Sequence, residues 1–119
     1  MRKFISVMLV AAMAVTALTG CGSNSSSSSK KDADKYYIGG IGPTTGATAI
    51  YGTAVKNGAQ IAVDEINAAG GINGKQIEYR FEDDQNDAEK AVNAYNTLKD
   101  WGMQMLVGTT TTAPCIAVA

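Results

Sequence analysis

The sequence predicts an α/β fold, in which helices pack on the faces of a parallel β-sheet. Three observations support this prediction. Segments with the composition of β-strands alternate along the chain with two longer segments whose apolar residues recur every three or four positions, as in amphipathic helices. Glycine-rich or polar turns separate these segments. The resulting order is β-α-β-α-β, and because such crossovers are right-handed, the strands are expected to be parallel.

The first expected strand covers residues 36–41, an aromatic and β-branched run with glycines near its end. A polar loop, residues 42–51, follows it. A helix is expected over residues 52–69, because Gly70 and Gly71 supply a C-terminal stop. The apolar residues of this helix recur at helical spacing and are Val55, Ala59, Ala62, Val63 and Ile66.

The second expected strand follows the turn at Asn73 and Gly74. Its apolar residues Ile77, Tyr79 and Phe81 alternate with polar ones, a pattern typical of a strand that is exposed on one side. We therefore expect this strand at an edge of the sheet.

A second helix is expected over residues 88–101, with Asp87 as its N-cap and Gly102 after its end. The buried stripe of this helix is expected to contain Ala91, Val92, Tyr95 and Leu98. The continuous apolar run 103–107 is expected to be a central strand covered on both faces. Pro114 indicates the beginning of a third helix.

The first and third strands are the more hydrophobic, so a spatial order 2-1-3 is expected. Ligands bind such sheets beyond the carboxyl ends of the strands, at the point where the winding direction reverses. That point lies here between strands one and three. The polar loops 42–51 and 108–112 both emerge there, which makes them the candidate binding loops.

The first twenty residues have the pattern of a secretory signal. Arg2 and Lys3 precede an apolar segment, residues 4–18, and the motif ends at Cys21. The apolar run is shorter than the ~20 residues that a transmembrane helix needs. We expect residues 1–20 to be a lipoprotein signal peptide and residues 21–35, which are rich in serine, to be a tether. The folded part is then residues 36–119.

By resemblance to bacterial lipoproteins, Cys21 is expected to carry a lipid and to anchor the mature chain to the outer face of the cell membrane. Removal of the signal would leave eight basic and eleven acidic residues, a net charge of −3. This weak acidity argues against nucleic acid as a partner. The sequence contains no histidine, so neither an enzyme nor a metal site is expected, and no cofactor is implied.

Several motifs together resemble those of the branched-chain amino-acid-binding (Leu/Ile/Val-binding-like) substrate-binding proteins of ABC transporters. The matching segments are 41–46 (IGPTTG), 51–52, 57–59, 64–75 (DEINAAGGINGK), 82–85 (EDDQ), 91–92 and 107–112 (VGTTTT). The resemblance implies a Rossmann-like type I periplasmic-binding-protein fold with two lobes that close on an amino acid. It also implies ABC permease subunits as partners. Only the first β-α-β-α-β part of lobe 1 is present here, so a truncated N-terminal part is expected.

The resemblance also implies roles for residues of the two candidate loops. Tyr51 matches the aromatic residue that lies against the ligand, and Thr112 matches the hydroxyl residue that binds its α-carboxylate. Thr110 and Thr111 belong to the same candidate site. A helix N-terminus and a hydroxyl donor suit a carboxylate. The alternative is that the threonines merely begin a helix and that Tyr51 is a core aromatic.

The pair Asp83 and Asp84 is expected to form a solvated turn rather than a catalytic or metal site, because no histidine or third carboxylate is placed to help. Two alternatives to a transport function stay open. One is a ligand-sensing receptor domain of the same fold, and the other is an inactive truncated lipoprotein.

Overall fold

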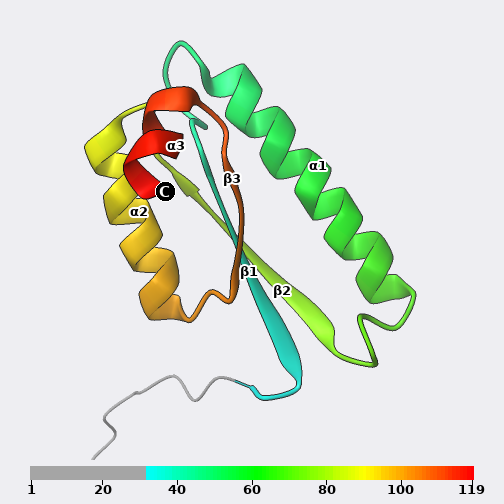
Figure 1. Ribbon diagram of the computed structural model, residues 1–119. Helices are drawn as coiled ribbons and strands as arrows, with labels where there is room; N and C mark the ends of the chain where they lie inside the picture. The colour runs from blue at the N-terminus through cyan, green and yellow to red at the C-terminus, as the bar shows by residue number, and fades with distance from the viewer. Residues whose placement is uncertain (1–31) are drawn as a thin grey trace, which may run out of the picture.

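The computed structural model describes residues 32–119, so the expected signal, Cys21 and most of the tether lie outside the described residues. Six elements follow one another, and Figure 1 shows their arrangement. They are β1 (Lys35–Gly42), α1 (Ala49–Ala68), β2 (Gln76–Asp83), α2 (Ala88–Trp101), β3 (Met105–Thr109) and α3 (Thr112–Val118). The predicted order of elements is confirmed. Within residues 32–119, no helix is both long and apolar enough to cross a membrane.

The three strands form one parallel sheet in the order β2-β1-β3, which confirms the expected spatial order. Ile38 of β1 lies opposite Tyr79 of β2 and Met105 of β3. A Cβ atom on Gly40 would lie 2.6 Å from the Tyr79 hydroxyl oxygen and 2.6 Å from the Phe81 ring. The central strand contains glycine at this position because aromatic side chains of β2 lie against its backbone.

The best-packed core lies between α2 and the sheet. The Asp87 carboxylate begins α2 by accepting a hydrogen bond from the Lys90 backbone N–H at 2.9 Å. Gly102 ends the helix in the left-handed conformation, with φ of 102°. The predicted bounds of this helix are confirmed, but the expectation that Val92 lies on its buried stripe is wrong, since Val92 is exposed. Four residues are buried in this core: Ile41, Ala91, Ala94 and Leu98.

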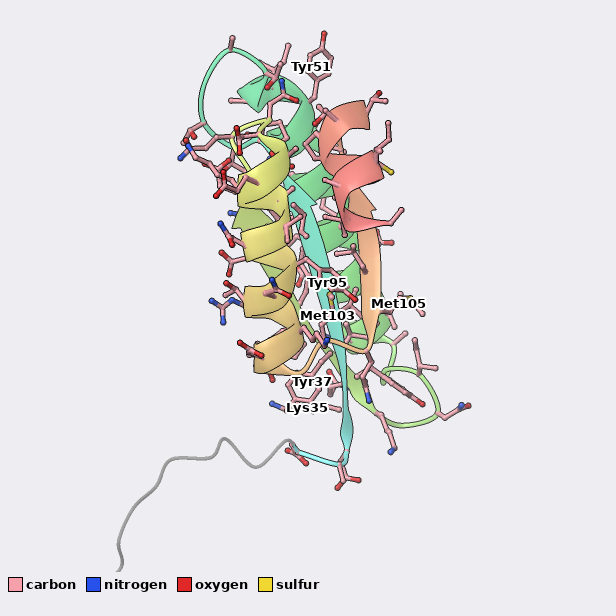
Figure 2. All side chains as sticks on the ribbon, turned by 60° about the vertical axis from the view of Figure 1, so that its left-hand side comes forward. Lys35, Tyr37, Tyr51, Tyr95, Met103 and Met105 are labelled. Carbon is pink, nitrogen blue, oxygen red and sulfur yellow. The ribbon has the colours of Figure 1, made fainter. Side chains whose placement is uncertain are left out.

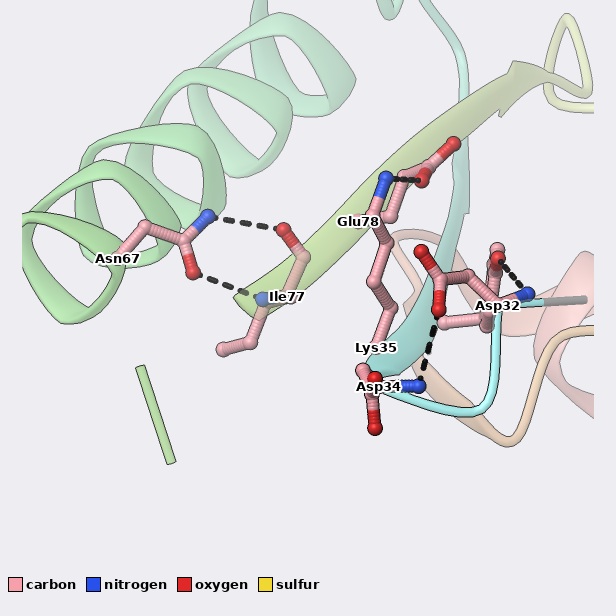
Figure 3. Close-up of polar contacts among 7 residues, drawn as sticks. Asp32, Asp34, Lys35, Asn67, Ile77 and Glu78 are labelled. Atoms are coloured by element: carbon pink, nitrogen blue, oxygen red, sulfur yellow. Dashed lines mark hydrogen bonds and ion pairs between the residues drawn. The ribbon is translucent and has the colours of Figure 1, made fainter. Parts of the chain in front are cut away.

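Helix α1 lies on the opposite face of the sheet from α2 and α3 (Figure 1). Near its C-terminal end, the Asn67 side chain makes two hydrogen bonds with the backbone of Ile77, shown in Figure 3. Its Oδ1 accepts from the Ile77 N–H at 2.7 Å, and its Nδ2 donates to the Ile77 carbonyl at 2.8 Å. An ion pair of 3.0 Å between Lys35 and Glu78 joins β1 to β2 nearby. Because that pair is exposed, the Asn67 contact is the stronger link of the two.

Helix α1 begins at Ala49, three residues before its predicted start, so Tyr51 lies in its first turn rather than in the preceding loop. Gly52 is buried there against the Pro43 carbonyl, and glycine is required because a Cβ atom would collide with that carbonyl. The apolar stripe of α1 is only partly buried. Val63 is buried, but Val55 and Ile66 are each 37% exposed. A three-stranded sheet is too narrow to cover the whole stripe.

The expectation that the third strand is central and covered on both faces is wrong for the described residues. β3 pairs with β1 on one side and forms the edge of the sheet, and Met105 is 61% exposed. The strand also starts two residues later than predicted, since the Met103 N–H still bonds the Leu98 carbonyl at the end of α2. A continuous apolar run indicates that both faces of a strand can be buried. It does not indicate which elements of the fold bury them.

Candidate ligand-binding site

The two candidate loops meet at the carboxyl ends of β1 and β3. The Ile41 carbonyl accepts hydrogen bonds from the Thr110 N–H at 3.2 Å and from the Thr110 hydroxyl at 3.3 Å. Next along β1, a Cβ atom on Gly42 would collide with the Thr110 side chain. The close fit of these two loops places the starts of α1 and α3 at one end of the sheet. This is the end where ligands are expected to bind, because the winding direction of the sheet reverses between β1 and β3.

The three threonines of the candidate site lie in different surroundings. The Thr110 hydroxyl donates to the Ile41 carbonyl and so holds the loop to β1. Thr111 is the N-cap residue of α3 but makes no side-chain cap hydrogen bond, and its buried hydroxyl oxygen has no partner among residues 32–119. Thr112, the first residue of α3, is exposed. Thr112 is therefore the threonine of this loop that a solute can reach.

Tyr51 is 58% exposed, so among residues 32–119 it is not a core aromatic. Figure 2 shows it at the same end of the molecule as α3 and far from Tyr37 and Met105. The close contact of Gly52 with Pro43 holds the first turn of α1 against the preceding loop. This contact places the phenol ring of Tyr51 at this end of the sheet. The structure thus brings Tyr51 and the threonine loop to one end of the sheet.

Asp83, the last residue of β2, holds the loop that leads to Tyr51. Its carboxylate accepts hydrogen bonds from the Thr44 N–H at 2.8 Å, the Thr45 hydroxyl at 2.6 Å and the Gln85 N–H at 3.0 Å. Partial burial acts to raise the pKa of Asp83, but the hydrogen bonds from these residues outweigh it and lower the pKa below its usual value. Asp83 is therefore an ionised anchor for the β1–α1 loop.

The expectation of a solvated turn is wrong for Asp84, which is completely buried. Its Oδ1 accepts a hydrogen bond from the Asn86 N–H at 2.8 Å, whereas its buried Oδ2 has no partner among the described residues. Burial raises the pKa of Asp84, and the nearby Asp83 and Asp87 carboxylates add to this effect. The burial of Asp84 could not be predicted from the sequence, because a run of polar residues normally indicates a segment exposed to solvent.

The carboxylates of the Asp83–Asp87 segment accept hydrogen bonds from nearby loops. No group of three or more possible metal-ligating side chains occurs in the part of the chain that the structure describes. The geometry of these carboxylates supports a loop anchor next to the crevice.

In open parallel α/β sheets, ligands bind at loops that emerge at such a switch point. Residues 35–119 match the periplasmic binding protein family, and the chain belongs to that family. The chain is 44% identical over 82 residues to the Leu/Ile/Val-binding protein BraC3 of Rhizobium johnstonii, a match that covers 69% of this chain and 22% of BraC3. It is 41% identical over 76 residues to the leucine-, isoleucine-, valine-, threonine-, and alanine-binding protein of Pseudomonas aeruginosa, covering 64% and 20%.

Among solved structures, the chain resembles the branched-chain amino acid transporter substrate-binding protein LivJ of Streptococcus pneumoniae in complex with isoleucine. The TM-score is 0.67 at 40% sequence identity, and the match covers 71% of this chain and 24% of LivJ. These relatives confirm the predicted family and the type I periplasmic-binding-protein fold. The chain spans about a quarter or less of the length of the relatives it matches.

Proposed function

We propose that this chain is the N-terminal part of an extracytoplasmic solute-binding component of an ABC importer for branched-chain or related amino acids. The observation that carries this proposal is that Tyr51 and the Thr110–Thr112 loop lie at the same end of the sheet, beyond the carboxyl ends of β1 and β3. The names of the relatives BraC3 and LivJ support the ligand class. A binding role rather than catalysis agrees with the lack of histidine in the sequence.

In the proposed site, the exposed Thr112 hydroxyl donates a hydrogen bond to the ligand carboxylate. Thr111 belongs to the same proposed site, and its buried hydroxyl, which has no partner among residues 32–119, becomes a second donor only if the loop shifts to admit the ligand. The Tyr51 ring packs against the aliphatic part of the ligand. Thr110 and Asp83 do not contact the ligand but hold the two loops in place through Ile41 and Thr44. In this proposal, the groups that neutralise the ligand's ammonium lie in the part of the relatives' length that this chain does not cover.

The proposed partners are ABC permease subunits and the membrane, the latter through a lipid on Cys21. The resemblance of the Leu18–Cys21 segment to lipoprotein signals supports the anchor.

A chimera tests the proposed ligand. Residues 32–119 of this chain replace the corresponding part of LivJ, and isothermal calorimetry measures binding of leucine, isoleucine and valine. Binding of at least one of them, with loss of affinity in Thr112→Val, supports the proposal. A folded chimera that binds none of the three amino acids would contradict it.

A further inference from the structure

The sequence contains asparagine followed directly by glycine at two places, Asn57 with Gly58 and Asn73 with Gly74. In such a pair the backbone nitrogen of the glycine can attack the asparagine side chain, because glycine has no side chain to hinder the close approach. All four residues are exposed, so exposure to solvent does not distinguish the two pairs. The conformation of the backbone does distinguish them.

The first pair lies in the interior of helix α1. Each backbone N–H inside an α-helix donates to the carbonyl four residues earlier, so the Gly58 nitrogen is engaged in the helix. This nitrogen reaches the Asn57 side chain only when that part of the helix opens. The helix therefore protects Asn57.

The second pair forms the two-residue turn that joins α1 to β2. The φ angles of Asn73 and Gly74 are both positive, 52° and 79°, as in the type I′ turn that favours Asn-Gly. The Ile72 N–H donates to the Lys75 carbonyl at 2.8 Å, and the Lys75 N–H donates to the Ile72 carbonyl at 3.0 Å. Within residues 32–119, neither the Gly74 N–H nor the Asn73 side chain makes a hydrogen bond. Both reacting groups are therefore free.

The turn fixes the position at which β2 begins. The Lys75 Nζ donates to the Ala33 carbonyl at 2.7 Å, and a Cβ atom on Gly71 would collide with the Lys75 carbonyl. Directly after the turn, the Ile77 N–H donates to the Asn67 side chain (Figure 3). A change in the length of the turn therefore reaches the first residues of β2. The turn lies at the amino end of this strand, whereas the candidate ligand loops lie at the carboxyl ends of the strands.

We propose that Asn73 is a site of spontaneous conversion to isoaspartate, that α1 protects Asn57 from the same reaction, and that the conversion opens the turn. The Gly74 backbone nitrogen loses its proton to solvent base and forms a bond to Cγ of Asn73. The bond between Cγ and the side-chain nitrogen breaks, and that nitrogen takes a proton from water and leaves as ammonia. Water then opens the resulting cyclic imide at either carbonyl, which gives aspartate or isoaspartate. The net reaction consumes water and releases ammonia, and no electron is transferred.

Isoaspartate alters the turn in two ways. The backbone then runs through the side chain of residue 73 and gains a methylene group, and the new carboxylate adds a negative charge. A longer turn cannot keep both hydrogen bonds between Ile72 and Lys75, so the start of β2 is expected to loosen. Because this end of the sheet is remote from Tyr51 and Thr112, the inference does not rest on the proposed function.

Incubation of the full 119-residue chain at mildly alkaline pH tests the proposal. Peptide mapping by mass spectrometry measures asparagine, aspartate and isoaspartate at positions 57 and 73 over several weeks. We expect isoaspartate to accumulate at position 73, with conversion of Asn57 slower by at least about tenfold because its helix must open first. In urea the two positions should react at similar rates, since the helix no longer protects Asn57. Isoaspartate identifies the imide route, because direct hydrolysis of the amide gives aspartate alone.

Hydrogen exchange measures the effect on the fold. The modified chain is separated by its additional negative charge and compared with the fresh chain. We expect faster exchange at the Ile77 amide and unchanged exchange at the amide of Ala94, which is buried on α2.

Two substitutions at position 73 separate the steps. Asn73→Gly keeps a residue that adopts positive φ but removes the amide, so exchange at Ile77 should stay constant throughout the incubation. Asn73→Asp, measured when fresh, adds the charge without the methylene group and should leave exchange at Ile77 close to that of the unsubstituted chain.

Three results would overturn the proposal. The first is equal conversion of Asn57 and Asn73 in the chain without urea, and the second is the absence of isoaspartate at position 73. The third is unchanged exchange at Ile77 in the modified chain, or the same loosening in fresh Asn73→Asp, since the longer backbone would then not be its cause.

Discussion

The side chain of Asn67 in α1 satisfies both backbone hydrogen-bonding groups of Ile77 in β2, at 2.7 Å and 2.8 Å. The amide thus pairs with the outer side of β2 as the backbone of a further strand would. This single residue joins the end of α1 to β2, an edge strand of the sheet. It fixes the end of the helix whose first turn carries Tyr51.

Replacing Asn67 by alanine is expected to lower the free energy of unfolding by about 1 to 3 kcal/mol, because both Ile77 backbone groups lose their partner in a half-buried position. Urea unfolding of the LivJ chimera measures the change. Asn57→Ala, at an exposed position of the same helix, is the control and is expected to be neutral or slightly stabilising. Equal effects of the two substitutions would show that the Asn67 contact contributes nothing.

The buried Asp84 predicts a dependence of stability on pH. Its pKa in the folded state is raised above the usual 3.8, so the folded state binds a proton more tightly than the unfolded state does. The free energy of unfolding should therefore fall as the pH rises from 3.8 through the raised pKa, and Asp84→Asn should remove that fall. Urea unfolding of the chimera between pH 3 and roughly pH 8 tests this linkage.

Asp83 provides the control of opposite sign. Its pKa is lowered, so its contribution is present above the usual pKa of 3.8 and is lost as the pH falls through the folded-state pKa. Asp83→Asn should therefore lower stability at neutral pH and reduce, without removing, the effect of Asp84, because burial is the largest cause of the raised Asp84 pKa and the Asp83 charge only adds to it. A profile that neither substitution alters would mean that these two carboxylates ionise alike in the folded and unfolded states.

Export and lipidation are expected to depend on Cys21. Cells labelled with a radioactive fatty acid should incorporate the label into the unsubstituted chain and not into Cys21→Ala. Cys115→Ala, which changes the other cysteine, should be labelled normally. Equal labelling of the Cys21→Ala chain would contradict the lipoprotein interpretation.

The 119-residue chain alone is expected to bind no branched-chain amino acid with useful affinity. Its crevice offers Tyr51 and threonine hydroxyls, but one part of a lobe cannot enclose a ligand. Calorimetry with leucine, isoleucine and valine should give only the heat of dilution. Micromolar binding would show that ligand binding does not need the part of the relatives that this chain does not cover.

Thr112→Val in the chimera keeps the side-chain shape and removes the hydroxyl donor. A hydrogen bond to a charged group is worth about 1.5 to 3 kcal/mol, so the affinity should fall about ten- to a hundredfold while the ligand-free melting temperature stays nearly constant. Thr110→Val is the matched control. Because the Thr110 hydroxyl bonds the Ile41 carbonyl, its loss should cost about 1 kcal/mol of stability. The reverse pattern would make Thr112 the structural residue.

Local signals in the sequence predicted α2 most accurately. Asp87, the helical spacing of its apolar residues and Gly102 all lie within the helix or next to it, so no distant contact is needed to recognise them. The start of α1 was less predictable. The side chain of Thr48, the N-cap residue, makes no capping hydrogen bond. The first turn is held instead by the contact between Gly52 and Pro43, which the spacing of apolar residues cannot predict.

The sequence by itself determined the order of the elements, the 2-1-3 sheet and the two loops at its switch point, because these follow from periodicity, turn residues and the handedness of crossovers. Only the tertiary structure decided that Asp84 is buried, that the Thr110 hydroxyl is engaged while Thr112 is exposed, and that β3 lies at an edge. The physical reason is that burial and hydrogen bonding depend on which distant segments arrive beside a residue. Polarity and spacing along the chain do not specify those neighbours.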